Sequence, residues 1–299
     1  MAWSWIAPCQ RSIEVRRCFR HPVCARSSGA VSEQWRSRLR WGSAEADAVV
    51  ATVEMVIYGI NPVIEALRAG RATSVDVDDP TRPRLRALIQ LAEASGVAVQ
   101  RRTGVQLTRS SRGRLHQGVV ANVAPFRTHT LDELLKGAAL PLFVVVDGIE
   151  DPQNLGAVLR TADAAGVDGV IRQSRRVARL DGATAKASAG AVMYVPVVQV
   201  VNIARTLDTL KASGVWTVGL DERASYQYDQ VDLTLPTAVV LGAEGKGLRR
   251  LVRERCDWLI SIPMVGHVTS LNVSVAAGIV LFEAVRQRLV NQSRSRSGA

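Results

Sequence analysis

The sequence predicts an α/β protein with two folded domains, and three observations support this. From Leu142 onward, short apolar runs of strand length alternate with amphipathic helical patterns, which is the order of a parallel sheet covered by helices. A shorter alternation of the same kind occupies residues 55–125. The chain has 299 residues, enough for two domains of ordinary size and a tail.

The composition favours a globular protein that binds a polyanion. Hydrophobic residues make up 47% of the chain, so a sizeable core can form. No apolar run approaches the roughly 18 residues needed to span a bilayer, and no membrane partner is expected. The net charge of +11 favours phosphate-rich partners such as RNA. A solvated basic surface without a partner stays open as the alternative.

The four cysteines indicate a reducing compartment, and we expect a cytoplasmic protein. Three of the four lie in the N-terminal tail, and no disulfide framework is apparent. Cys9, Cys18 and Cys24 with His21 could in principle bind zinc, but their spacing fits no common zinc pattern. No metal site is expected.

The tail, residues 1–54, is rich in arginine and shows no lasting periodicity. Its composition resembles an organelle transit peptide, which is one interpretation. The favoured interpretation is a disordered basic tail, or a misassigned start upstream of a true beginning at Met55.

Residues 55–125 form the first predicted domain, a small α/β unit. Asn61 is the expected N-cap of its first helix, with Pro62 at the first helical position and the helix ending near Arg68. A second helix is expected over residues 82–95, and strands are expected over 56–58, 97–100 and 119–123. The hydroxyl-rich loop 108–115 could contact phosphates or be an ordinary surface loop; its basic residues are Arg109, Arg112 and Arg114.

A linker, residues 126–140, containing a short helix over 131–135, leads to the second domain, residues 141–290. Residues 291–299 are expected to be a disordered tail. In the second domain, strands are predicted over 142–146, 169–171, 195–198, 215–219, 238–241 and 258–262. Asp151 and Pro152 mark the start of its first helix, which carries an apolar stripe at helical spacing.

Two loops of this domain each follow a strand and precede a helix, where an open α/β sheet binds its ligand. One is the glycine-rich loop Gly242–Gly247, in which Glu244 is the one carboxylate and would repel a phosphate. Its spacing also differs from that of a P-loop. The other leads from Ile262-Pro263 to Ser270-Leu271-Asn272, which precede the last helix.

Two helices carry further candidates. Arg160 lies about 150° around its helix from the apolar stripe, so it points away from the core, and Asn154 lies at the N-terminus of the same helix. On spacing alone, the favoured interpretation is an exposed arginine and a capping asparagine. The last helix, residues 271–288, has a stripe of small residues that favours internal packing, with a subunit interface as the alternative; the stripe contains Ser274, Ala277, Gly278 and Leu281.

Three ordered motifs in the second domain resemble those of the SpoU/TrmH family, which are S-adenosylmethionine-dependent RNA ribose 2′-O-methyltransferases. The motifs are Asn154-Leu-Gly-Ala-Val-Leu-Arg160-Thr161, Leu241-Gly-Ala-Glu244-Gly-Lys-Gly247, and Ile262-Pro263-Met264 followed by Ser270-Leu271-Asn272-Val273-Ser274. In the first domain, residues 58–63 and 116–120 resemble the substrate-binding domain of the 23S rRNA guanosine-2′-O-methyltransferase branch.

The resemblance implies a second domain whose C-terminal segment is threaded into a trefoil knot (the SPOUT fold), and an L30e-like first domain that binds RNA. It implies S-adenosylmethionine as cofactor, contacted by Gly242, Ile262 and Leu271, and a homodimer formed through the last helix. It also implies a catalytic group, which consists of Asn154, Arg160, Glu244, Ser270 and Asn272.

The chemistry agrees with these residue types. The methyl donor is an activated sulfonium, so no metal is required. A guanidinium stays protonated, so we expect Arg160 to bind the neighbouring phosphate and stabilise the developing alkoxide rather than to act as a base. We expect Asn154 and Asn272 to orient Arg160 and Glu244.

The favoured substrate is a guanosine of 23S rRNA, with tRNA as the alternative. A nicotinamide-dependent oxidoreductase is disfavoured because the glycine loop is not G-x-G-x-x-G. A non-catalytic RNA-binding protein is disfavoured because every motif position is present.

Overall fold

The structure is a computed structural model that describes residues 55–127, 129–175 and 177–297. The expectations for residues 1–54, including the zinc hypothesis, lie outside the described residues. Among the helices that are described, none combines the length and the apolar character that crossing a membrane requires.

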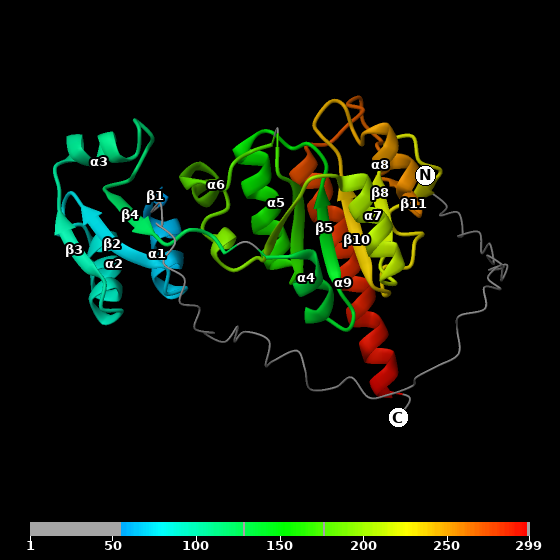
Figure 1. Ribbon diagram of the computed structural model, residues 1–299, viewed down its shortest axis with the longest axis horizontal. Coiled ribbons are helices and arrows are strands. Elements are labelled where there is room, and N and C mark those ends of the chain that lie inside the picture. The colour runs from blue at the N-terminus through cyan, green and yellow to red at the C-terminus, as the bar shows by residue number, and fades with distance from the viewer. Residues whose placement is uncertain (1–54, 128, 176, 298–299) are drawn as a thin grey trace, which may run out of the picture. The chain divides into compact units, whose positions relative to one another are not determined.

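The first domain is a four-stranded mixed sheet with the order β1-β4-β2-β3 (Figure 1). β4 pairs antiparallel with β1 and β2, and β2 pairs parallel with β3. Leu85, Leu88 and Ala92 of α2 are fully buried. The elements are β1 (Met55–Tyr58), α1 (Ile60–Arg68), β2 (Ala72–Val77), α2 (Pro83–Ala94), β3 (Ala98–Arg101), α3 (Gly104–Ser110) and β4 (Val119–Val123).

Three details of this domain differ from the predictions. The prediction of Asn61 as N-cap is wrong, because α1 begins at Ile60 and its first N–H is bound by the side chain of Gln117 (N to Oε1, 3.1 Å). The first three residues of the predicted loop 108–115 are helical, because Thr103 and Gln106 form a capping box that starts α3. The strand β2 was not predicted.

The second domain contains a seven-stranded sheet in the order β7-β6-β5-β10-β8-β11-β9, and every neighbouring pair is parallel. The parallel α/β class is therefore confirmed. The central strands β5 and β10 are buried at every residue, as their unbroken apolar runs require. The strands are β5 (Leu142–Val146), β6 (Gly169–Gln173), β7 (Val197–Val200), β8 (Trp216–Leu220), β9 (Tyr226–Gln227), β10 (Thr237–Leu241) and β11 (Trp258–Ser261).

Helices cover both faces of this sheet (Figure 1). One face packs against α5 and α9, and the other packs against α4, α7 and α8. Alternate side chains of β5 therefore belong to two separate clusters of buried hydrophobic residues, one on each face. The helices are α4 (Leu131–Gly137), α5 (Pro152–Ala164), α6 (Gly182–Ala187), α7 (Ile203–Ala212), α8 (Arg250–Arg255) and α9 (Val273–Ser297), with a 3₁₀ turn at Ala191–Met193.

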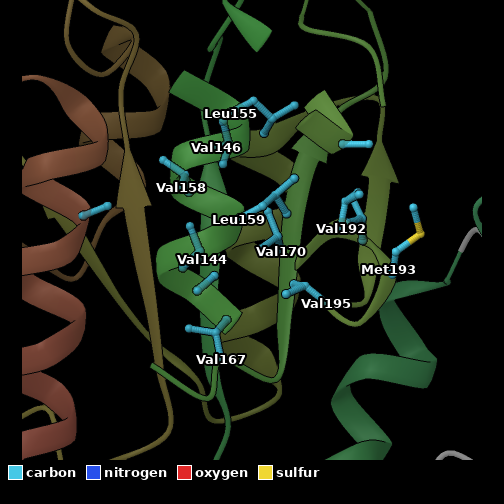
Figure 2. Packing of buried hydrophobic residues seen from close by; sticks show 14 of the residues in the cluster. Val144, Val146, Leu155, Val158, Leu159, Val167, Val170, Val192, Met193 and Val195 are labelled. Atoms are coloured by element: carbon cyan, nitrogen blue, oxygen red, sulfur yellow. The ribbon is translucent and has the colours of Figure 1, made fainter. Parts of the chain in front are cut away.

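The predicted apolar stripe of α5 forms the centre of one cluster. Leu155, Val158 and Leu159 are buried and lie over Val144 and Val146 of the sheet (Figure 2). Gly156 allows α6 to approach closely, since a Cβ there would lie 2.3 Å from the Cβ of Ala187. The stripe therefore fixes the position of α5, and with it the residues at its N-terminus.

Two predicted boundaries need correction. Residues 126–140 are more than a linker, because Leu134 of α4 is buried in the second domain and would contact any Cβ at Gly169. Residues 291–297 are not a disordered tail but the last turns of α9. No Gly or Pro interrupts the chain between Leu289 and Ser297, so the helix has no local reason to stop earlier.

The stripe of small residues on α9 packs internally, which was the favoured interpretation. Ala277 and Leu281 are fully buried, and Gly278 faces Thr161 of α5. A different face of α9 is exposed, and it carries Val275, Phe282 and Leu289.

Arg288 fastens α9 to the edge of the sheet where the strands begin. Its residue exposure is only 6%. Its guanidinium donates to four backbone oxygens, at distances between 2.8 and 3.1 Å. The acceptors are Leu140, Pro141, Leu233 and Leu235. A buried cation is thus satisfied by carbonyl groups of the segments that lead into β5 and β10.

We predict that Arg288→Met lowers the free energy of unfolding by about 3 kcal/mol or more, because several buried carbonyls lose their charged donor. Urea denaturation measures the change. Arg250→Met is the matched control: Arg250 forms an exposed ion pair with Glu254, and its loss should cost less than about 1 kcal/mol. Equal effects of the two substitutions would contradict the role given to Arg288.

Candidate active site

The candidate site lies where the strand order of the large sheet reverses. From β5 the sheet continues through β6 and β7 on one side, and from β10 through β8 and β11 on the other. The carboxyl ends of β5 and β10 are neighbours, since Val146 pairs with Leu241. Ligands of open α/β sheets bind at such a switch point. The glycine loop begins here, and the second predicted loop begins at the same edge of the sheet, after β11.

The start of α5 is built as its sequence predicts. Asp151 is the N-cap, and its carboxylate accepts from the N–H of Gln153 at 3.0 Å, while Pro152 occupies the first turn. Asn154 follows at the beginning of the helix and is 8% exposed. The cap therefore places the Asn154 amide at the carboxyl edge of the sheet.

The Asn154 amide connects the three motifs. Its Nδ2 donates to Oε2 of Glu244 at 2.8 Å, and its Oδ1 accepts from Nδ2 of Asn272 at 2.9 Å. The other end of Asn272 is also bound, because its Oδ1 accepts from the N–H and the hydroxyl of Ser274 at the start of α9. Segments separated by 90 and 118 residues are thereby joined by one unbroken chain of hydrogen bonds.

The glycine loop after β10 is a closed turn with Glu244 near its tip. Ala243 and Gly247 exchange both backbone hydrogen bonds, at 3.1 and 2.8 Å. Gly245 and Gly247 have φ of 72° and 63°, which side chains rarely adopt. A Cβ on Gly242 would lie 2.2 Å from the carbonyl carbon of Gly247, so the two stems of the loop can meet only with glycine at this position.

A cavity of about 450 Å³ lies beside this network. It is formed by the ends of β8 and β11 and by the loop 262–271, and its lining includes Ile262, Ser270 and Leu271 from the predicted site. Gly242 is not among its lining residues. The volume is within the range of about 300–1,000 Å³ that is typical of sites for small molecules.

Both charged residues that line the cavity are carboxylates, Asp221 and Glu222. Asp221 is paired with Nε of Arg253 at 2.8 Å, and Glu222, whose side chain is 58% exposed, lies 3.7 Å from Nε of Arg223. The carboxylates line the cavity and the arginines do not, so the lining itself suits a ligand with cationic groups. Sequence reasoning missed residues 220–222, although they directly follow a predicted strand and therefore had to reach the same edge of the sheet.

The structure does not bring Arg160 into the network. Arg160 is exposed on α5, as predicted, and within the described part of the chain it makes no hydrogen bond or ion pair. Six residues separate it from Asn154, which is about 120° of helix rotation. The expected orientation of Glu244 by Asn154 is present, whereas the expected orientation of Arg160 by an asparagine is not.

The three predicted RNA-binding arginines lie at the end of α3 in the first domain. All three are exposed, and Arg112 has a left-handed backbone with φ of 54°. The turn between them is ordered by Ser111, a buried residue whose hydroxyl donates to the carbonyl of Arg114 at 2.9 Å. These arginines are therefore presented by a fixed turn.

The one cysteine that the structure describes is not a nucleophile. Burial, and next the charge of Asp257, raises the pKa of the Cys256 thiol to about 12. The thiol is therefore protonated at neutral pH, and it packs against Gly219, where a Cβ would lie 2.8 Å from its sulfur.

Comparison with known proteins gives two family matches. Residues 141–282 match the SpoU rRNA Methylase family. Residues 56–129 match a family described as RNA 2′-O ribose methyltransferase substrate binding. The two matched ranges follow the two domains of the structure.

The chain aligns with individual relatives over nearly the whole length of each relative. The 23S rRNA (guanosine-2′-O-)-methyltransferase RlmB of Photobacterium profundum is 44% identical over 79% of this chain and 98% of its own length. YacO of Bacillus subtilis, provisionally named a TrmH family tRNA/rRNA methyltransferase, is 42% identical over 78% of this chain and 95% of its own. The SpoU methyltransferase AviRb of Streptomyces viridochromogenes, solved in complex with the cofactor AdoMet, is 28% identical, with a TM-score of 0.66 over 79% of this chain and 91% of that chain.

Proposed function

The chain belongs to the SpoU rRNA methylase family, and we propose that it transfers the methyl group of S-adenosylmethionine to the ribose 2′-hydroxyl of a guanosine in 23S rRNA. The observation that carries this function is the hydrogen-bond chain from Asn272 through Asn154 to Glu244. It unites the three motifs beside a cavity of suitable size. We also propose a cytoplasmic location, because that is where an enzyme would meet the proposed rRNA substrate.

The cavity fits S-adenosylmethionine. The cofactor carries a sulfonium, an ammonium and a carboxylate group and is positive overall, and the charged lining residues Asp221 and Glu222 are both acidic. Ile262 and Leu271 supply apolar and backbone contacts. When bound, the cofactor supplies a methyl group that is already activated. We infer that Gly242 supports this site indirectly, by closing the neighbouring loop.

Within this site the protein has to orient the ribose hydroxyl and to stabilise its developing negative charge. We assign orientation to Glu244, whose position is fixed by Asn154 and, through it, Asn272. Ser270 lines the cavity and can bind the substrate or the cofactor at its mouth. Arg160 supplies the positive charge; its lack of a partner among the described residues leaves its guanidinium available for a phosphate or an alkoxide.

We further propose that Arg109, Arg112 and Arg114 contact RNA phosphates. Their support is their exposure on an ordered turn within the domain that matches the substrate-binding family. A filter-binding salt titration of the variant with alanine at all three positions tests this. A salt slope unchanged from the parent would remove them from the interface.

The substrate is tested by methylation in vitro. The protein with labelled S-adenosylmethionine should methylate 23S rRNA, and mapping should place the label on the 2′-oxygen of a guanosine. Separated tRNA is the parallel substrate. Label on tRNA alone would replace the rRNA proposal with the tRNA alternative, and label on neither RNA would contradict the proposed activity.

Arg160→Ala should lower single-turnover methylation at saturating RNA by about 10²- to 10³-fold, because a charge-stabilising donor is lost. Arg160→Lys should also be slow, since it keeps the charge and loses the planar fork. Folding should be nearly unchanged because the side chain is exposed. Calorimetry should show cofactor affinity close to that of the parent. Methylation at the parent rate would mean that Arg160 is an ordinary surface residue.

We also propose that the protein is a homodimer formed through α9. Val275, Phe282 and Leu289 are each about half exposed or more and recur every seven residues, so they form one apolar stripe along the helix. The stripe lies on the side of the helix away from the buried residues Ala277, Val280 and Ala284. A second copy that pairs with this stripe would bury it.

Phe282→Asp should convert the dimer into monomers in sedimentation velocity, since a charge would stand at the centre of the stripe. Leu251→Asp is the control, because Leu251 is equally exposed but lies on α8. A parent protein that sediments as a monomer, or a Phe282→Asp variant that stays dimeric, would contradict this interface.

The trefoil knot that the resemblance implies is likewise a proposal. Its support is the placement of β10 between β5 and β8, which brings the C-terminal segment back across the middle of the sheet. A crystal structure that traces residues 220–297 tests it.

A further inference from the structure

Asp147 is a completely buried carboxylate that none of the three motifs contains. It directly follows β5, and it has no exposed surface. Its Oδ2 accepts from the backbone N–H of Arg249 at 3.0 Å, and its Oδ1 accepts from Nε of Arg249 at 2.7 Å and also from Nη2. Both oxygens of the buried carboxylate are thus hydrogen-bonded by one residue, Arg249, so the position of Asp147 relative to Arg249 is fixed.

The same residue also binds the other stem of the glycine loop. The backbone N–H of Asp147 donates to the carbonyl of Leu241 at 2.8 Å. Leu241 ends β10 immediately before the loop, and Arg249 follows the loop as the N-cap residue of α8. Asp147 therefore joins the two stems from which the turn containing Glu244 projects.

Asp147 and Asn154 belong to the same β5–α5 connection. Asp147 directly follows β5, and Asn154 lies in the first turn of α5. The next residue after Asp147 also packs on the loop, since a Cβ on Gly148 would lie 3.6 Å from the Cβ of Ala243. The β5–α5 segment thus contacts the glycine loop at its stems through Asp147 and at its tip through Asn154.

We propose that the Asp147–Arg249 pair has a positioning role in the methyl transfer. It fixes the stems of the glycine loop relative to the β5–α5 connection, so that the Glu244 carboxylate lies within hydrogen-bond distance of the Asn154 amide. This inference rests on the proposed function for its kinetic consequence, although the loop geometry itself does not. Neither Asp147 nor Arg249 needs to touch the substrate or the cofactor. A displacement of about 1 Å at a catalytic group can cost about 10² in rate, so the pair can matter without contact.

The test is a double-mutant cycle with the catalytic carboxylate. Asp147→Asn keeps the shape and removes the charge, and it should lower single-turnover methylation by about 10- to 100-fold with cofactor affinity within about threefold of the parent. In a Glu244→Gln background the same substitution should cost less than about threefold, because the group that it positions is already gone. Equal losses in both backgrounds, or no loss in the parent, would overturn the proposal.

Hydrogen exchange of residues 243–248 provides a readout without activity. Exchange in this loop should be faster in Asp147→Asn, while exchange in β5 and β10 stays slow. Unchanged exchange would overturn the proposal even if no RNA were methylated. If the parent fails to methylate RNA while loop exchange rises as expected, the proposed function fails and the positioning role stands.

Two further variants complete the design. Arg249→Lys retains the backbone donor to Oδ2 and one charged donor, so it should fold even if Asp147→Asn does not, and it should lose about three- to tenfold in rate. Glu254→Gln is the matched control, because it removes a carboxylate from another arginine of the same helix, in an exposed pair. Its rate should stay within about twofold, and a larger loss would mean that charge removal near α8 acts without the loop.

Discussion

The site depends on one side-chain amide that uses both of its ends. Asn154 donates to a carboxylate on one side and accepts from a second amide on the other. Aspartate at this position could not donate, and serine could not span both partners. Because the amide is largely buried, the loss of either partner would leave the donor or the acceptor of Asn154 unsatisfied. The demand for a donor and an acceptor on opposite sides explains the residue type better than a role as a helix cap, which Asp151 already performs.

The sheet makes this arrangement possible. The residues that follow parallel strands all lie at one edge of the sheet. Where the strand order reverses, the connections after two neighbouring strands run to opposite sides, and this leaves space between them for a ligand. The site thus draws on the loops that follow β5, β10, β8 and β11 without a long excursion of the chain. Helices on both faces exclude water from β5 and β10, so the loops stand on a rigid base. Only a few side chains form the site, and most of the domain serves to position them.

The sequence predicted the elements whose signals are local. The stripe of α5, its cap at Asp151, and the apolar runs of β5 and β10 were all apparent from spacing and composition. What failed was set at long range. The start of α1 depends on Gln117, a residue 57 positions away, and no local pattern can reveal such a cap. The pairing of Asp147 with Arg249 spans 102 residues and gives no motif. Arg160, by contrast, was placed correctly on its helix, but spacing could not show whether Asn154 would reach it.

The contacts of Arg288 have a consequence for the order in which this domain can be completed during synthesis. The carbonyls of Leu140 and Pro141 belong to the entry of the first strand of the large sheet, and their donor is translated almost 150 residues later. Until then, that end of β5 lacks its charged donor while the central strands are already available to pair. We expect the nascent domain to stay only partly ordered until α9 docks. Docking of α9 would then complete the hydrogen bonding of a sheet whose apolar strands were synthesised much earlier.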